Sequence, residues 1–95
     1  MPAATRLGDV CSGHGCFPSR PNDQGSPNVF TNGISAHRLG DHWVTHCCLA
    51  SCHDSELAHG SSTVFINGLQ ASRIGDAIAC GSTVATGSSN VFIGG

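Results

Sequence analysis

Residues 25–41, GSPNVFTNGISAHRLGD, are matched 35 positions later by residues 60–76, GSSTVFINGLQASRIGD. The two copies share the pattern G-S-x-[NT]-V-F-x-N-G-x-x-A-x-R-[LI]-G-D. Self-similarity at a fixed spacing is typical of architectures assembled from repeated structural units. The sequence therefore predicts a repeat protein rather than a single irregular core.

Each copy of the pattern predicts a strand, a turn and a second strand. Val-Phe suits a pleated strand, and Asn-Gly is the strongest short hairpin signal because both residues tolerate positive φ. Arg-x-Gly-Asp then ends the second strand in a tight turn. No window has a 3.6-residue period long enough for a helix, so we expect an all-β fold of short strands and loops.

Half copies of the pattern stand at the two ends of the chain. Residues 87–95, GSSNVFIGG, match its first half, and residues 4–9, ATRLGD, match its second half. Joining the C-terminus to Pro2, and so skipping Met1, restores the eight-residue spacing from Phe to Arg. We expect residues 1–95 to form a single domain whose third repeat is split between the termini, closing a small, conical, pseudo-threefold molecule.

The composition excludes several classes of protein. The 95 residues include four Arg and no Lys, and the net charge is −2, so no basic surface for nucleic acid is expected. No segment approaches the roughly 20 apolar residues of a transmembrane helix, and residues 1–9 lack the apolar run of a signal peptide. A domain this small usually needs a staple, and six Cys and six His offer either disulfides or a metal.

Metal-binding residue types fall at matching places after the Gly-Asp turns. His14 and His46 each lie five positions after the Asp, and Cys80 lies four positions after its own. Threefold symmetry would direct all three side chains at the axis. A tetrahedral Zn²⁺ needs a fourth ligand, and the extra loop of residues 47–59 supplies His53 as the preferred candidate.

The other histidines are expected outside this set. His37 occupies a variable position of the repeat, which indicates a surface or packing role. His42 is expected to face solvent, and His59, just before a Gly-Ser turn, to be structural. His59 and His42 remain alternatives to His53 as the fourth ligand.

Five cysteines are left without a role by the sequence. Cys16 and Cys48 both lie seven positions after an Asp, so a disulfide between them is one possibility, and buried free thiols are the other. No C-x-x-C is present to suggest a thioredoxin-like or zinc-ribbon site. The open set is Cys11, Cys16, Cys47, Cys48 and Cys52.

These motifs resemble those of PAAR-repeat proteins, a family named for a Pro-Ala-Ala-Arg motif. The motif is degenerate here, with PAATR at residues 2–6, ISAHR at residues 34–38 and LQASR at residues 69–73. The resemblance implies a small pointed β-structure stapled by one structural zinc ion, held by three His and one Cys. By motif position these are His14, His46, Cys80 and, in a loop longer and richer in Cys than is usual, His53.

The resemblance also implies a function. The protein would cap and sharpen a trimeric β-helical spike, either a phage central spike or a VgrG-type spike, for envelope piercing, with one copy per trimer. Phe30, Phe65 and Phe92 would be core or spike-binding residues at the wide end. The expected location is the virion tail tip, or the bacterial cytoplasm before delivery through a type VI secretion system. Because the sequence ends at Gly95, we expect no appended effector domain, which favours a stand-alone tip, as in phage tails.

An enzyme and a disulfide-stapled binding domain are the two other classes that the residues could suggest. A zinc hydrolase would need an open coordination position and a nearby general base. Glu56 is the only Glu, and most of the Asp residues belong to Gly-Asp turns, so we expect no enzyme. The alternative function is a disulfide-stapled small secreted binding domain.

Overall fold

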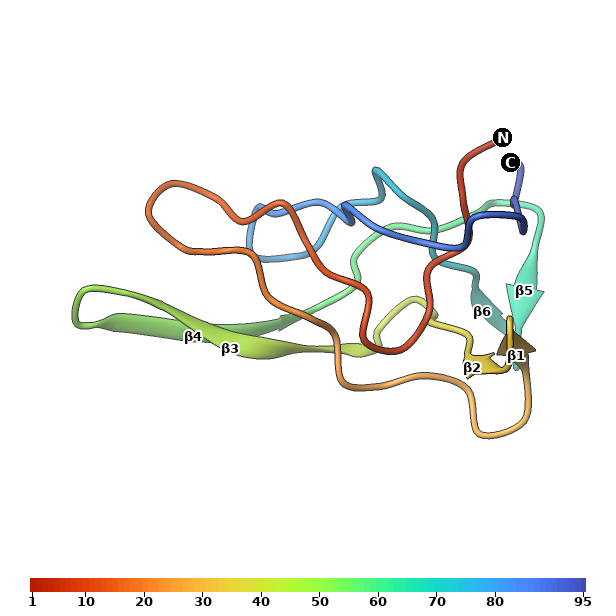
Figure 1. The fold of residues 1–95 in the computed structure, drawn as a ribbon, viewed down its shortest axis with the longest axis horizontal. Coiled ribbons are helices and arrows are strands. Elements are labelled where there is room, and N and C mark those ends of the chain that lie inside the picture. The colour runs from red at the N-terminus through yellow and green to blue at the C-terminus, as the bar shows by residue number, and fades with distance from the viewer.

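Three antiparallel hairpins form the regular structure of residues 1–95, all of which the computed structural model describes. The prediction of an all-β fold with short strands is confirmed, since no helix is present (Figure 1). The molecule measures 38 × 24 × 22 Å. Its strands are β1 (Phe30–Thr31), β2 (Ile34–Ser35), β3 (His42–Cys48), β4 (Ser51–Glu56), β5 (Phe65–Ile66) and β6 (Leu69–Gln70).

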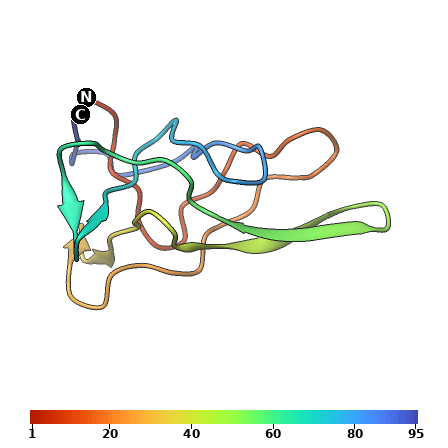
Figure 2. The ribbon, with the colours of Figure 1, turned by 180° about the vertical axis from the view of Figure 1, so that it is seen from behind.

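The hairpins β1–β2 and β5–β6 are equivalent units made by the two complete repeats. Their turns are Asn32-Gly33, with φ of 55° and 76°, and Asn67-Gly68, with φ of 54° and 78°. Positive φ at both central residues is the hairpin turn that Asn-Gly favours. Both hairpins lie at the end of the molecule where the chain termini also meet (Figures 1 and 2).

A ring of backbone hydrogen bonds marks the pseudo-threefold axis. The N–H of Thr5 donates to the carbonyl of Ser72 (3.0 Å), Ser72 donates to His37 (3.1 Å), and His37 donates to Thr5 (3.1 Å). All three residues are buried. They occupy the same position of the repeat pattern, so the pseudo-threefold architecture predicted from the register is confirmed. The N-terminal segment joins the ring, and Ala3 pairs with Phe92 near the C-terminus.

An arginine–aspartate clamp follows each ring residue. In every copy the carboxylate accepts hydrogen bonds from the backbone N–H and the guanidinium of the arginine three positions earlier. The intervening glycine has a φ of 85–90°, which a residue with a Cβ rarely adopts. The clamps are Arg6–Asp9, Arg38–Asp41 and Arg73–Asp76.

Trp43 is the centre of the main apolar cluster. It is fully buried and packs with Cys11, Leu57, Ile78 and Val84. A smaller cluster under the wide end consists of Ala36, Ile66 and Ala71, with Ile93 beside it. The core is small, as expected for a chain of this length.

His37 is a packing residue, so the surface alternative for it was wrong. Its ring is fully buried and meets Trp43 edge-on, with centroids 5.3 Å apart. Its Nδ1 lies 2.7 Å from the carbonyl of Gln24, which can only accept, so Nδ1 carries the proton. Burial lowers the pKa of His37, which keeps the imidazole neutral beside the axis.

His42 faces solvent in part, with 40% of its side chain exposed, and is held between two carboxylates. Its Nδ1 lies 2.6 Å from Asp23 and its Nε2 lies 2.8 Å from Asp54. Hydrogen bonds to Asp54 and Asp23 raise the pKa of His42. The imidazolium therefore ties the segment before β1 to the β3–β4 hairpin.

No helix in the structure is long and apolar enough to cross a membrane.

Replacing Asp41 should show how much one arginine–aspartate clamp contributes to the free energy of unfolding. In Asp41→Ala the buried guanidinium of Arg38 loses its counter-charge, and breaking such a buried pair costs about 3–5 kcal/mol. Urea unfolding followed by the fluorescence of the single tryptophan measures the free energy of unfolding. The exposed Glu56→Ala is the control and should change it by about 0.5 kcal/mol or less. A loss below about 1 kcal/mol in Asp41→Ala would contradict the role of the clamp.

The pairing of His42 with Asp23 and Asp54 predicts that the stability lost on replacing His42 depends on pH. Because folding raises the pKa of His42, its contribution is fully present below the unfolded pKa of about 6.5 and is lost as the pH rises through the folded pKa. The melting temperature of His42→Gln should therefore fall below that of the parent chain at pH 6 and approach it at pH 9. A difference in melting temperature that stays constant from pH 6 to pH 9 would contradict the explanation by the charge of His42.

Candidate metal centre

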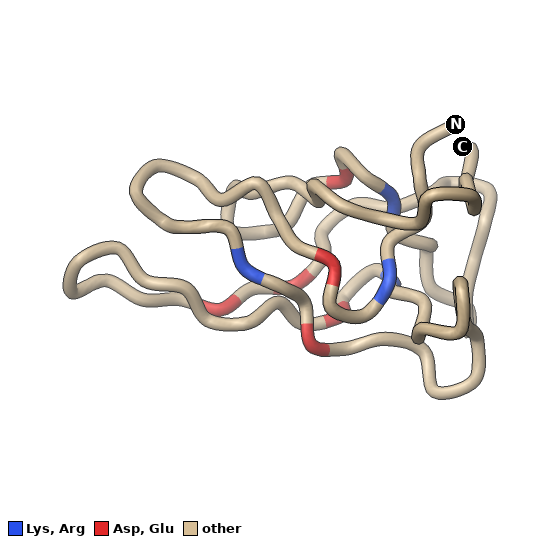
Figure 3. Tube along the Cα trace, in the orientation of Figure 1, with Lys and Arg blue, Asp and Glu red and all other residues tan.

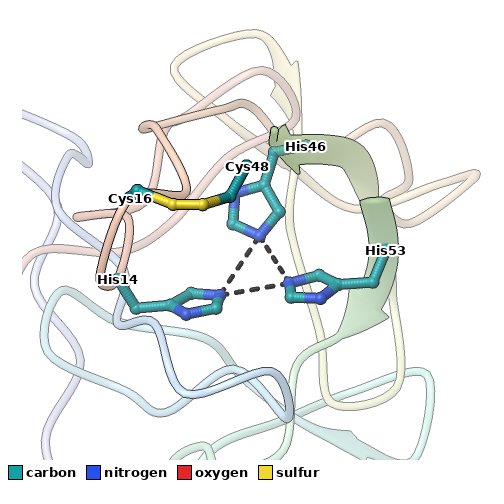
Figure 4. Close-up of a disulfide and its surroundings, with 5 residues drawn as sticks. All are labelled: His14, Cys16, His46, Cys48 and His53. Carbon is teal, nitrogen blue, oxygen red and sulfur yellow. Dashed lines mark hydrogen bonds between the residues drawn. A yellow bond between two sulfur atoms is a disulfide. The ribbon is translucent and has the colours of Figure 1, made fainter. Parts of the chain in front are cut away.

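Three imidazoles converge where the β3–β4 hairpin meets the loop of residues 11–20 (Figure 4). The Nε2 atoms of His14 and His46 lie 3.2 Å apart, those of His14 and His53 lie 3.1 Å apart, and those of His46 and His53 lie 2.7 Å apart. Cys80 completes the group, since its sulfur and the three ring nitrogens all lie within 4.8 Å of one another. The structure thus brings together the four residues that the sequence singled out as ligands.

A bulge in β3 turns His46 toward this cluster. Trp43 pairs with Ser55, but His46 pairs with His53, so β3 contains one residue more than β4 between these pairs. Side chains of a regular strand alternate between faces, which would place residues three apart on opposite sides. The bulge allows both Trp43 and His46 to be buried, one in the core and the other in the cluster.

Glycines shape the loop that carries His14. His14 and Phe17 exchange two backbone hydrogen bonds across a tight turn. Gly13 has a φ of 73°, and a Cβ there would lie 2.6 Å from the carbonyl oxygen of Phe17. Only glycine fits this close approach, so Gly13 fixes the direction in which His14 leaves the turn.

The geometry fits a four-coordinate metal ion. A tetrahedral ion with metal–nitrogen bonds of about 2.0–2.1 Å holds its nitrogen ligands roughly 3.3 Å apart. The His14–His46 and His14–His53 separations, 3.2 and 3.1 Å, lie close to this value, and the 2.7 Å separation of His46 and His53 is shorter. Imidazole nitrogen and cysteine sulfur are donors that closed structural sites use, so the four residues could hold a metal ion.

Hydrogen bonding and burial prepare the imidazoles for a metal. His46 Nδ1 lies 2.8 Å from the carbonyl of Pro18, so Nδ1 carries the proton and Nε2 presents a lone pair to the cluster. Burial, followed by the proximity of His46 and His53, lowers the pKa of His14. The hydrogen bond thus fixes the tautomer of His46, and the lowered pKa favours the neutral form of His14, the form that binds metal ions.

Phe17 lies against the triad and was not identified from the sequence. Its ring centroid is 4.7 Å from that of His14, 4.8 Å from His46 and 4.2 Å from His53. An apolar ring on three ligand rings restricts their orientation and keeps water away from them. By the register that matches Cys16 with Cys48, Phe17 corresponds to Leu49, which is not aromatic, so the register carried no signal for it.

Arg20 is a second residue that sequence reasoning missed. Its side chain is buried, donates from Nε to the carbonyl of Val44 (2.6 Å) and lies with its guanidinium carbon 5.6 Å from the centroid of the Trp43 ring. Its two terminal nitrogens reach the sulfurs of Cys11 (3.1 Å) and Cys80 (3.5 Å). Arg20 therefore helps to fix the position of the Cys80 sulfur, the candidate ligand atom.

The remaining cysteines separate into two bonded pairs and one free thiol. Cys16 is joined to Cys48, the pairing suggested by the superposition of repeats, and Cys47 is joined to Cys52. Cys11 is free and buried. Burial raises the pKa of Cys11, but hydrogen bonds from Ser82 and Arg20 outweigh it and lower the pKa overall.

The two alternative ligands lie outside the cluster. His42 is engaged by its two carboxylates. His59 is 65% exposed at its side chain and pairs with Asp76. Neither belongs to the group of four that could bind a metal.

The three phenylalanines of the repeats lie far from this cluster, at the wide end. Phe30, Phe65 and Phe92 are 57%, 55% and 51% exposed, so they are surface residues rather than core. Val29 and Val64 beside them are also exposed. The charged side chains gather in the middle of the molecule, which leaves this end without Lys, Arg, Asp or Glu (Figure 3).

The comparisons with known proteins agree with this architecture. No curated protein matches the sequence. A family model described as the PAAR motif matches residues 8–86. Proteins with this motif are structural spike components rather than enzymes, and the match supports a spike-tip role in a contractile injection system and association with a spike protein. The chain belongs to the PAAR-motif family.

Proposed function

We propose that this protein caps and sharpens the trimeric central spike of a contractile injection machine for envelope piercing. The observation that carries the proposal is the pairing of a pseudo-threefold wide end without charged side chains with a cluster of candidate metal ligands toward the opposite end. In this proposal residues 1–95 act as one domain whose third repeat is divided between the termini. The pairing of Ala3 with Phe92 supports that division.

The proposed metal is one Zn²⁺, bound by His14, His46, His53 and Cys80. Four protein ligands close a tetrahedral site, which suits a structural ion. The ligands come from the 11–20 loop, both strands of the long hairpin and the 77–83 loop. Structural zinc contributes on the order of 10 kcal/mol to folding, so the ion would hold these segments together at the point during piercing.

The wide end is the proposed binding surface for the spike. Phe30, Phe65 and Phe92 occupy equivalent repeat positions and are similarly exposed, so one copy can offer the same contact to each chain of a trimer. Matching pseudo-threefold to threefold symmetry predicts one copy per trimeric β-helical spike. β1 and β5 each pair with one strand only, so backbone pairing with a strand of the spike is a further contact in this proposal.

The machine is proposed to be either a phage tail or a type VI secretion system. In the first case the protein lies at the virion tail tip. In the second it assembles in the bacterial cytoplasm and is then delivered through the secretion system.

The two disulfides favour a second candidate, a disulfide-stapled secreted binding domain. Such a domain would retain its fold without a metal, because disulfides alone would supply the staple. Zinc content therefore separates the two candidates.

Metal analysis of the purified chain should find one zinc per chain, and this content should fall below one-tenth in His46→Ala and in His53→Ala. The control is His59→Ala, which leaves the four ligands intact. Thermal melts with and without a chelator should show a lower melting temperature after zinc removal in the parent chain. A chain without bound zinc and with unchanged melts in chelator would refute the metal-stapled tip.

Spike binding should be lost when the wide end is charged. Phe65→Asp places an uncompensated carboxylate in the proposed contact, and removing an anchor residue costs about 2 kcal/mol or more, equal to a loss of roughly 30-fold in affinity. Co-expression with the cognate spike trimer and light scattering of the complex measures binding and stoichiometry. Ile74→Asp, an exposed apolar position in a clamp turn, is the control. A folded Phe65→Asp that still binds the trimer would show that the contact lies elsewhere.

A further inference from the structure

The four paired cysteines flank the three candidate histidine ligands. Cys16 lies two positions after His14, Cys47 and Cys48 follow His46 directly, and Cys52 immediately precedes His53. The Cys16–Cys48 bond joins the His14 loop to β3 (Figure 4), and the Cys47–Cys52 bond joins β3 to β4. The two bonds therefore connect the same three segments that a metal held by the histidines would connect.

The hairpin that carries His46 and His53 has little other support at its end. β3 and β4 form a two-stranded sheet, and such hairpins are marginal in water without further packing. Leu49 in its turn is 99% exposed and has a φ of 57°, a conformation that a leucine rarely adopts. Cys47 and Cys52 face each other one register pair behind this turn, where a cross-link prevents the hairpin end from opening.

The Cys16–Cys48 bond adds a connection of a different kind. It joins residues 32 apart in sequence, with Cα atoms 5.4 Å apart, a separation that a disulfide spans. The loop that carries His14 has no strand of its own. A covalent bond to β3 removes conformational freedom that this loop would otherwise lose only when a metal binds.

We propose that these four cysteines form a redox lock that controls how well the triad is organised for its metal. Reduced, the three histidine-bearing segments depend on the ion to bring them together. Oxidised, they are already joined, so zinc binds more tightly and the point stays closed if the ion is removed. The inference rests on the proposed metal centre, and it adds a modification that responds to the compartment in which the tip is found.

The chemistry requires an external oxidant. Each pair of thiols loses two protons and two electrons as its sulfur–sulfur bond forms. A small-molecule disulfide accepts them by thiol–disulfide exchange and leaves as two thiols. Cys80 and Cys11 are free and both lie against Arg20, so the lock uses neither the candidate ligand sulfur nor its buried neighbour.

The test compares the whole chain in two redox states, with Zn²⁺ as the probe. One sample is treated with oxidised glutathione and the other with a phosphine reductant, and intact mass gives the number of disulfides. Zinc affinity is then measured by competition with a chelator of known affinity. The oxidised chain should carry two disulfides and bind one zinc at least about tenfold more tightly than the reduced chain, since pre-organisation removes the ordering cost.

Paired variants assign the effect to each bond. Cys16→Ser with Cys48→Ser, and Cys47→Ser with Cys52→Ser, should each reduce the affinity difference between redox states. Ser51→Ala, at an exposed position of the same hairpin, leaves both pairs intact, so it is the control and should keep the difference. Limited proteolysis of the zinc-free samples should cut the reduced hairpin near Leu49 and spare the oxidised one.

Each remaining outcome counts against a specific claim. Equal zinc affinity in both redox states, with the disulfides present only after oxidation, would overturn the redox lock and leave the metal centre standing. Two zinc ions per reduced chain would overturn it as well, because the four thiols would then form a second metal site. No zinc in either state would overturn the proposed metal centre itself, and the redox lock with it.

Discussion

Thr5, Ser72 and His37 each donate a backbone N–H to the next residue around the pseudo-threefold axis. A closed ring of this kind exists only when all three segments are present, and the segments are 32 and 35 residues apart in sequence. The ring therefore makes the fold depend on long-range contacts from the start, which is typical of slowly folding β-proteins. It also holds three distant parts of the chain at the same height along the pseudo-threefold axis, and the loops leave the ring in equivalent directions.

The positions of the candidate ligands follow from the alignment of the three segments at this ring. His14 lies nine residues after Thr5, and His46 lies nine residues after His37. Cys80 lies eight residues after Ser72. Because each segment passes through the same arginine–aspartate clamp on the way, equal spacing along the chain becomes proximity in space. His53 reaches the same place by pairing with His46 across the long hairpin.

This dependence on register explains how much could be predicted from the sequence. The all-β repeat fold, and the grouping of His14, His46 and Cys80, follow from positions that can be superposed. In the register that matches Cys16 with Cys48, Phe17 and Arg20 correspond to Leu49 and Cys52, residues of another kind, so the register carried no signal for either. The Cys47–Cys52 pair and the inward orientation of His46 depend on the bulge in β3 and its register, which side-chain alternation alone does not reveal.

The burial of His37 was ambiguous for a related reason. A position that varies between repeats is usually a surface position, but here all three variable residues are buried at the axis. Ser72 donates its hydroxyl to that of Thr5 (2.9 Å), and the larger His37 turns instead to Trp43 and the carbonyl of Gln24. Backbone geometry is shared by the repeats at this level, whereas side-chain packing is not.

The two ends of the molecule differ in the same way: the repeats keep equivalent side chains at the wide end and differ in their side chains at the point. Three equivalent repeats can offer three equivalent ligands, but a tetrahedral ion requires four, so threefold symmetry must be broken wherever such an ion binds. The long hairpin of one repeat breaks it by carrying both His46 and His53. A surface that meets a threefold partner has the opposite requirement, and the exposed phenylalanines of the wide end keep their equivalence. The chain can therefore diverge at the point without disturbing the proposed contact with the spike, because the hydrogen-bonded ring lies between them.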